Sequence, residues 1–194
     1  MTTPTHAPRR QLLLVAALFL GPLLIAALLY YGNFSGLPIG RTNHGQLLEP
    51  IVNLNDASGR PSLSGLTAGE TDNYWVLIYA NADECGDACA EALYRLRQSR
   101  LMLGNEMSRM KRVFLHGRTA PDTLFLKQQH QGLISVRDRN LGQLLQTKRP
   151  QDLPPGGLYL VDPLGNLVLY FSAELAPADM VDDIKHLLGL SQIG

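Results

Sequence analysis

The sequence predicts an α/β domain, with a central mixed sheet flanked by helices, after one N-terminal transmembrane helix. Three observations predict this class. An uncharged apolar run of twenty residues lies near the N-terminus. Beyond it, short β-rich apolar runs alternate with segments of helical periodicity, which is the pattern of strands joined by helices. The last two strand-like runs are separated only by a turn, so they form a hairpin and make the sheet mixed.

The composition excludes several classes of protein. A chain of 194 residues has room for one domain and a short appendage. Its 17 Lys and Arg balance its 17 Asp and Glu, so no overall charge attracts nucleic acid or an anionic membrane. Two cysteines are too few for a disulfide-stapled miniprotein or a four-cysteine zinc module. The 45% hydrophobic share is too high for a disordered protein.

Residues 12–31 are predicted to form an uncleaved membrane anchor. Twenty helical residues at about 1.5 Å each span the roughly 30 Å hydrocarbon core. Arg9 and Arg10 precede the run, which predicts a cytoplasmic N-terminus and an exported C-terminal part. The alternative is a signal peptide, but its apolar region is usually shorter and no clear cleavage site follows. We therefore expect a single-pass protein of the inner (cytoplasmic) membrane whose C-terminal domain is periplasmic.

The exported part begins with a predicted linker. Residues 32–50 are rich in Gly, Pro and Asn and have little periodicity, so they suit a linker that docks on the domain. Residues 1–11 are then the cytoplasmic N-terminus, and residues 51–194 the folded domain. Within residues 51–63 we predict two short strands around a turn at residues 55–59.

The remaining elements follow in order. Residues 74–80 form an almost continuous apolar run, as expected of a strand buried on both faces. In the helix predicted next, five apolar residues share one face: Cys89, Ala92, Leu93, Leu96 and Leu103. The later predicted elements are a strand at 113–115, helices at 121–129 and 141–146, strands at 157–162 and 166–172, and a helix at 177–188. This is the element order of the thioredoxin fold.

Cys85 and Cys89 are the candidate site residues, both for catalysis and for metal binding. They follow the first buried strand and open a helix, whose N-terminal N–H groups and dipole stabilise a thiolate. Because residues four apart in a regular helix are barely close enough for a disulfide, we expect Cys85 in an irregular turn before the helix. Reversible disulfide formation and Cu(I) binding are both open. The bland alternative is a structural disulfide, although so small a loop stabilises little.

Four features of the chain together resemble one known family: the stretch 54–60, the C-x-x-x-C pair, Val113-Phe114-Leu115 followed by Asp122-Thr123, and the stretch 159–165. They are similar to the corresponding parts of the Sco family, whose members are membrane-anchored, thioredoxin-fold assembly factors for cytochrome c oxidase. The resemblance spans about residues 50–190. It implies copper binding by the two cysteines and a later histidine, or thiol–disulfide reduction at the oxidase copper site. Residues 43–50 also resemble a short signature in proteobacterial single-span proteins associated with cytochrome oxidase.

The chain departs from the Sco pattern at the expected copper ligand. No histidine stands in residues 153–157, where the family places it. A Cu(II) site needs that nitrogen, whereas two thiolates alone suit Cu(I). His116 is the one histidine considered as a substitute ligand, although a solvated or hydrogen-bonded residue at a strand end is the favoured interpretation. Pro154 or Pro155 is the candidate for the cis-proline that faces the cysteines in thioredoxins, which favours thiol chemistry.

The sequence therefore predicts a periplasmic Sco-like factor in cytochrome c oxidase biogenesis, acting through the dithiol by thiol–disulfide exchange, Cu(I) handling or both. One alternative is a non-catalytic thioredoxin-like interaction module beside a respiratory oxidase, and another is a general periplasmic thiol-disulfide oxidoreductase. The expected partners are membrane lipid, through the anchor, and a cytochrome oxidase subunit or its assembly factors, but no nucleic acid. The basic residues between 95 and 112 are interpreted as a solvated helix face that an acidic partner could use.

Overall fold

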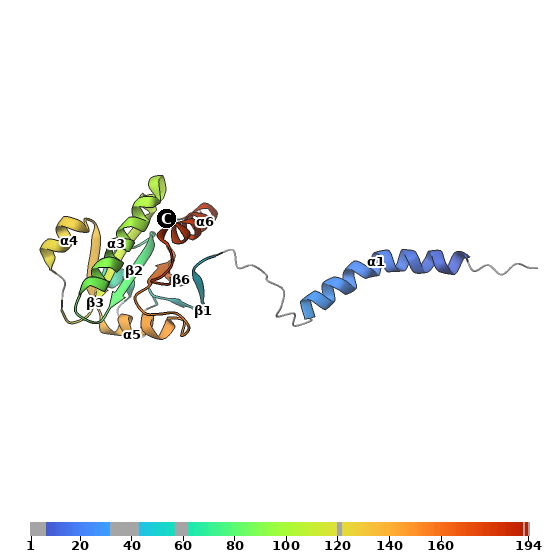
Figure 1. Ribbon diagram of the computed structural model, residues 1–194, viewed down its shortest axis with the longest axis horizontal. Helices are drawn as coiled ribbons and strands as arrows, with labels where there is room; N and C mark the ends of the chain where they lie inside the picture. The colour runs from blue at the N-terminus through green and yellow to red at the C-terminus, as the bar shows by residue number, and fades with distance from the viewer. Residues whose placement is uncertain (1–6, 32–42, 57–61, 120–121, 192, 194) are drawn as a thin grey trace, which may run out of the picture. The chain divides into compact units, whose positions relative to one another are not determined.

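The computed structural model describes residues 7–31, 43–56, 62–119, 122–191 and 193, in two compact units, Met1–Arg41 and Thr42–Gly194. The first unit contains helix α1 (Ala7–Tyr31), which continues through Pro22 (Figure 1). Its segment Arg10–Leu28 has a mean hydropathy of 2.4 and is long and apolar enough to cross a membrane. The predicted apolar helix is therefore confirmed. Proline within it is tolerated because neighbouring groups in membrane proteins satisfy the freed backbone carbonyl.

The second unit is built on a six-stranded mixed sheet of order β1-β6-β5-β2-β3-β4. Strands β2, β3 and β4 run parallel, and β5, β6 and β1 continue the sheet through antiparallel pairs. The strands are β1 (Gln46–Asn53), β2 (Trp75–Asn81), β3 (Met110–His116), β4 (Leu133–Arg137), β5 (Leu158–Val161) and β6 (Asn166–Phe171). The predicted hairpin is the β5–β6 pair, so the sheet is mixed as expected.

Helices cover both faces of this sheet. They are α2 (Leu63–Leu66), α3 (Asp87–Met102), the 3₁₀ helix η1 (Gly104–Arg109), α4 (Thr123–Gln129), α5 (Arg139–Lys148) and α6 (Pro177–Leu190). Helices α3 and α6 lie together on one face and α5 lies on the other (Figure 1). Side chains alternate along β2, so Leu77 and Tyr79 pack on the α3 side while Val76 and Ile78 pack on the α5 side. The strand is buried on both faces, as its continuous apolar sequence predicts.

Three elements differ from the sequence prediction. Strand β1 begins at Gln46, inside the predicted linker, because it pairs with β6 (Gln46 opposite Tyr170). The second strand expected within residues 51–63 is replaced by α2, whose first turn is capped by the Ser62 hydroxyl accepting from Gly65 N–H at 3.0 Å. Residues 57–61 of that predicted hairpin lie outside the described residues. Strand β4 was not predicted, and it forms the edge of the sheet beside β3.

Candidate functional site

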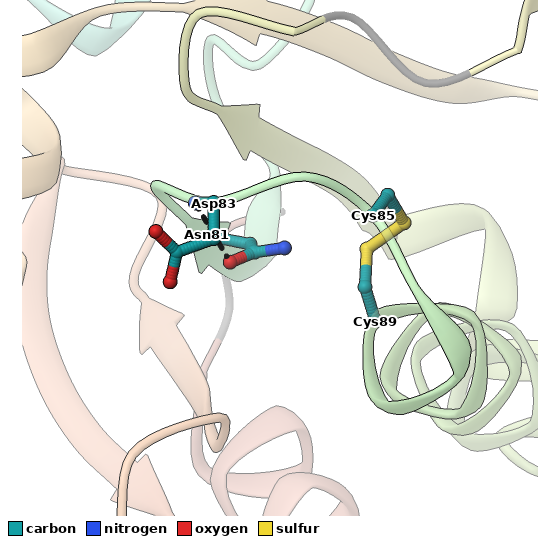
Figure 2. The surroundings of a disulfide bond; sticks show 4 residues. All are labelled: Asn81, Asp83, Cys85 and Cys89. Atoms are coloured by element: carbon teal, nitrogen blue, oxygen red, sulfur yellow. Dashed lines mark hydrogen bonds between the residues drawn. A yellow bond between two sulfur atoms is a disulfide. The ribbon is translucent and has the colours of Figure 1, made fainter.

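The two cysteines lie where the central strand β2 passes into helix α3. After Asn81 the chain turns, and the Asn81 side chain accepts a hydrogen bond from the Asp83 N–H at 3.2 Å (Figure 2). Cys85 lies in the irregular segment that follows, and α3 begins at Asp87 with Gly86 as its N-cap residue. The prediction that Cys85 precedes the helix is therefore confirmed. This offset brings the two Cα atoms to 5.0 Å, and the sulfurs form a disulfide.

The two sulfurs differ in accessibility. Cys89 is 3% exposed and belongs to the core between α3 and the sheet. Every residue of the predicted apolar face of α3 is buried with it: Ala92, Leu93, Leu96 and Leu103. Cys85 is half-buried and packs against the edge of that core. An attacking group can therefore reach Cys85 more readily than Cys89, which is the asymmetry that thiol exchange uses.

The electrostatic surroundings of the pair contain opposing contributions. No side chain caps the N-terminus of α3, and the two cysteines lie just before and within its first turn, close to its uncapped N–H groups and the positive end of its dipole. Exposed carboxylates flank the pair on the same segment, at Asp83, Glu84 and Asp87. They oppose the dipole, but water screens them because they are exposed.

The segment before β5 reaches the same end of the sheet as the cysteines. Leu158, at the start of β5, pairs with Tyr79 near the end of β2. Pro154 and Pro155 both follow trans peptide bonds, and within the described residues the cis bond precedes Pro50, so the expected cis-proline is absent here. The Tyr170 hydroxyl donates to the Pro154 carbonyl at 2.6 Å and accepts from the Gly157 N–H at 3.1 Å. These two bonds join the segment to β6.

His116 ends β3 opposite Asn81 of β2, as predicted. Its ring nitrogen Nδ1 donates to the Gly117 carbonyl at 3.0 Å, and the ring lies 5.9 Å from that of Phe114. This is the hydrogen-bonded strand-end histidine that the sequence favoured. Across the part of the chain that the structure describes, no three His, Cys, Asp or Glu side chains are grouped closely enough to hold a metal ion. Only the reduced pair would offer two soft sulfur ligands, and the described residues place no third such ligand beside them.

A large pocket, of about 840 Å³, opens beside the disulfide-bearing segment at the carboxyl ends of β2 and β3. Its lining includes Asn81 and Ala82, which follow β2, His116 and Gly117, which end β3, and residues of α5. Open α/β sheets commonly bind partners at this edge. The sequence did not reveal this pocket, because it depends on how the chain packs after each strand. At Gly117, for example, a Cβ atom would lie 1.9 Å from the Ala82 carbonyl oxygen.

The basic stretch between residues 95 and 112 is not the solvated face that was expected. The Arg95 guanidinium donates to the Ser172 carbonyl at 3.3 Å and to the Leu175 carbonyl at 2.5 Å, and burial lowers its pKa. Arg109 bonds Glu106 and the Leu188 carbonyl near the end of α6. The solvated-face interpretation is therefore wrong for these arginines. Their long apolar stems are covered while the charged heads reach carbonyl groups.

The comparisons with known proteins agree with this architecture. A family model described as "Transmembrane-like, thioredoxin-like, C-terminal domain" matches residues 75–191. No curated protein matches the sequence. Among solved structures, yeast Sco1 with copper bound is 18% identical with a TM-score of 0.50, over 63% of this chain and 82% of that chain.

Apo Sco1 from Thermus thermophilus is likewise 18% identical with a TM-score of 0.50, over 74% of this chain and 92% of that chain. At this level of identity the likeness shows a shared thioredoxin fold, in agreement with the resemblance carried by the sequence. Together with the match over residues 75–191, it shows that this chain belongs to the transmembrane-like, thioredoxin-like C-terminal domain family.

Proposed function

We propose that this protein is a membrane-anchored thiol–disulfide exchange factor whose reactive pair is Cys85 and Cys89. The observation that carries the proposal is the unequal burial of two bonded sulfurs at the start of α3. Cys85 is half-buried outside the helix, and Cys89 is buried within it. A purely structural staple over four residues would add little stability, because the loop it closes is very small.

In the proposed reaction the reduced protein acts on a disulfide substrate. The Cys85 thiolate attacks one substrate sulfur, the substrate S–S bond breaks, and the other substrate sulfur leaves as a thiolate. The Cys89 thiolate then attacks Cys85 Sγ, forms the Cys85–Cys89 disulfide and releases the first substrate sulfur. Two electrons pass from the protein to the substrate. A dithiol donor returns the protein to its reduced form by the reverse exchange.

The proposed location is the periplasmic side of the inner membrane, and the proposed substrate is a cytochrome c oxidase subunit or one of its assembly factors. Arg9 and Arg10 before the apolar helix support a cytoplasmic N-terminus, which would export the domain. The thioredoxin fold shared with the Sco1 structures, together with the Sco-like segments of the sequence, supports the oxidase substrate.

Copper is the second proposed substrate of the same pair, as cargo. The yeast Sco1 structure has copper bound. In this chain the reduced sulfurs of Cys85 and Cys89 would hold Cu(I) between them, because soft thiolate ligands bind Cu(I) preferentially. The described residues offer no third ligand to the pair, so Cu(II) would be held poorly. This donor set favours thiol exchange over the full copper chemistry of a three-ligand site.

The test is to trap the exchange intermediate in native membranes. Cys89→Ser removes the resolving sulfur, so Cys85 is expected to accumulate as a mixed disulfide that survives non-reducing electrophoresis. Cys85→Ser is the matched control, because the single cysteine that it leaves, Cys89, is the buried one, and it is expected to trap little. Mass spectrometry of the trapped species identifies the substrate.

The outcomes separate the alternatives. Trapped oxidase subunits or assembly factors support the proposal in full. A varied set of other exported thiol proteins would indicate a general periplasmic oxidoreductase instead. If neither variant traps a partner and both sustain normal oxidase levels, the dithiol is structural and the domain is an interaction module. A C-terminal alkaline phosphatase fusion that stays inactive would refute the exported location.

A further inference from the structure

A second pocket, strongly cationic, lies on the α3 side of the sheet, away from the cysteines. It has a volume of about 390 Å³ and is enclosed by the C-terminal half of α3, by β3 and by the end of α4. Its polar lining consists of three arginines and three glutamines: Arg97, Arg100, Arg112, Gln128, Gln129 and Gln131. The disulfide, in contrast, lies at the opposite end of α3. This cationic pocket is therefore separate from the candidate redox site.

Arg112 is the central feature of the cationic pocket. It is 3% exposed, and its Nη2 atom donates to the Gln131 carbonyl at 2.5 Å. Its Nε and Nη1 atoms are buried and have no hydrogen-bond partner among the described residues. A buried guanidinium with unpaired donors is energetically costly, and such groups are normally matched by an acceptor. The positive charge of Arg112 is therefore poorly compensated by the protein groups around it.

Among the residues that the structure describes, no carboxylate pairs with these arginines. Within the described residues the ion pairs are His44–Asp183 and Arg109–Glu106, so Arg97, Arg100 and Arg112 have no acidic neighbour in contact. Arg100 donates only to the Met110 carbonyl, at 2.8 Å. The positive charges of these arginines also act on one another. Burial, then Arg100 and Arg97, lowers the pKa of Arg112 to about 10.

His130, which ends α4, is affected by the same arginines. Burial lowers the pKa of its imidazole, and so do Arg112 and Arg97. Its ring packs against Phe125 at 5.0 Å between centroids, and its Nδ1 atom has no partner in the described structure. Burial and the nearby arginines therefore disfavour the protonated imidazole.

We propose that this pocket binds a phosphate group. Three guanidinium groups line one cavity. A phosphate monoester offers them three non-bridging oxygens with close to two negative charges, and a lipid phosphodiester offers two oxygens that share one charge on a tetrahedral centre, whereas a single guanidinium fork already pairs the two coplanar oxygens of a carboxylate. The glutamine amides at the rim add uncharged donors. A small phosphorylated metabolite and the phosphate of a lipid headgroup share this chemistry, and the same arginines would hold either.

The test uses the full-length protein, purified without phosphate in a neutral detergent and titrated with inorganic phosphate by calorimetry. Wild type is expected to show one saturable site. Arg97→Gln is expected to bind roughly tenfold more weakly, the loss of about one charge-assisted contact. Arg97 makes no hydrogen bond or ion pair in the described structure, so its replacement leaves the fold intact. Arg97→Lys keeps the charge without the fork and is expected to lie between the two.

Lys185→Gln is the matched control, because it removes one exposed positive charge from α6, outside the pocket. It is expected to leave phosphate affinity unchanged. A second readout is the pKa of His130, followed by NMR, which should rise when phosphate neutralises the arginines. Equal affinity in wild type and Arg97→Gln, or tighter binding of acetate than of phosphate, would overturn the proposal.

Nanodiscs distinguish the two sources of phosphate. If a lipid headgroup occupies the pocket, phosphatidylglycerol in a nanodisc lowers the apparent affinity for inorganic phosphate relative to the protein in phospholipid-free detergent, and Arg97→Gln removes the difference. If the ligand is soluble, the nanodisc and the detergent give the same affinity. Both results support a phosphate site, and they assign its ligand.

Discussion

The buried carboxylate of Asp183 fastens the start of the domain to helix α6, and removing its charge is expected to destabilise the domain. Asp183 is 6% exposed. Its Oδ1 atom accepts from the His44 backbone N–H and from the His44 ring Nδ1, each at 3.1 Å, and its Oδ2 atom accepts from the Gly45 N–H at 2.7 Å. These contacts join residues about 139 positions apart in the chain, so they fix the segment that leads into β1.

The size of the effect follows from what asparagine can replace. In Asp183→Asn the side-chain amide has one acceptor oxygen and one donor nitrogen. In one orientation of the amide its nitrogen faces the Gly45 N–H, and in the other it faces the two His44 donors. One buried donor is then unpaired, at a cost of about 1–3 kcal/mol, and the surviving bonds lose their charge. We therefore expect a loss of about 2–4 kcal/mol in the free energy of unfolding, or roughly 5–15 °C in Tm for a domain of this size.

Trp75 makes the assay specific, because it is the only tryptophan and it is buried in β2. Its fluorescence in urea, measured on the full-length protein in detergent, reports unfolding of the sheet. Asp182→Asn is the matched control, since it removes an exposed carboxylate from the neighbouring position of the same helix, and less than about 0.5 kcal/mol should be lost. If Asp183→Asn matched that control, the proposed fastening role would be refuted.

Two further predictions concern pH and packing. The hydrogen bond to Asp183 raises the pKa of His44 above 6.5, so the stabilising contribution of His44 is complete below about pH 6.5 and is lost as the pH rises through the folded-state pKa. The urea midpoints of wild type and His44→Gln should therefore converge at high pH. A constant difference between them would contradict this prediction. In Gly157→Ala a Cβ atom would lie 2.1 Å from the Phe171 carbonyl oxygen, so we expect the free energy of unfolding to fall by about 3 kcal/mol or more in the same assay. Gly189→Ala on α6 is the control, because its Cβ atom meets nothing within 4 Å, and it should be neutral or stabilising.

Local patterns were sufficient to predict the elements at the centre of the fold. The apolar run at residues 74–80 corresponds to β2 (Trp75–Asn81), because a strand buried on both faces needs no polar alternation. Strand β4 was missed because it is an edge strand of five residues, half-buried, with no continuous apolar signal. The first part of strand β1, residues 46–50, was assigned to the linker, and only residues from 51 onward were predicted as a strand, because the partner strand β6 lies about 120 residues further along the chain. Composition cannot show such distant pairing.

The candidate redox site was predictable to a similar extent. Helix geometry alone required Cys85 to precede α3 and placed Cys89 on its buried face, and both positions are as expected. The contact of the Pro154 segment with β6 was not predictable from sequence, because it joins residues that are distant in the chain. The Tyr170 hydroxyl, from a strand that follows later in the chain, bonds the Pro154 carbonyl and fixes that segment.

The basic residues show most clearly where sequence reasoning stops and what the structure adds. Without interleaved aromatic residues, the basic stretch was interpreted as a solvated helix face, but its arginines reach different environments. Arg95 satisfies carbonyls of the turn between β6 and α6, and Arg109 satisfies the Leu188 carbonyl near the end of α6, where helix carbonyls lack partners within the helix. Carbonyl oxygens satisfy these donors but carry no net negative charge. These carbonyl groups therefore hold the arginines in place without neutralising them. The positive charge remains uncompensated around Arg112, and for this reason we expect a phosphate to occupy the cationic pocket.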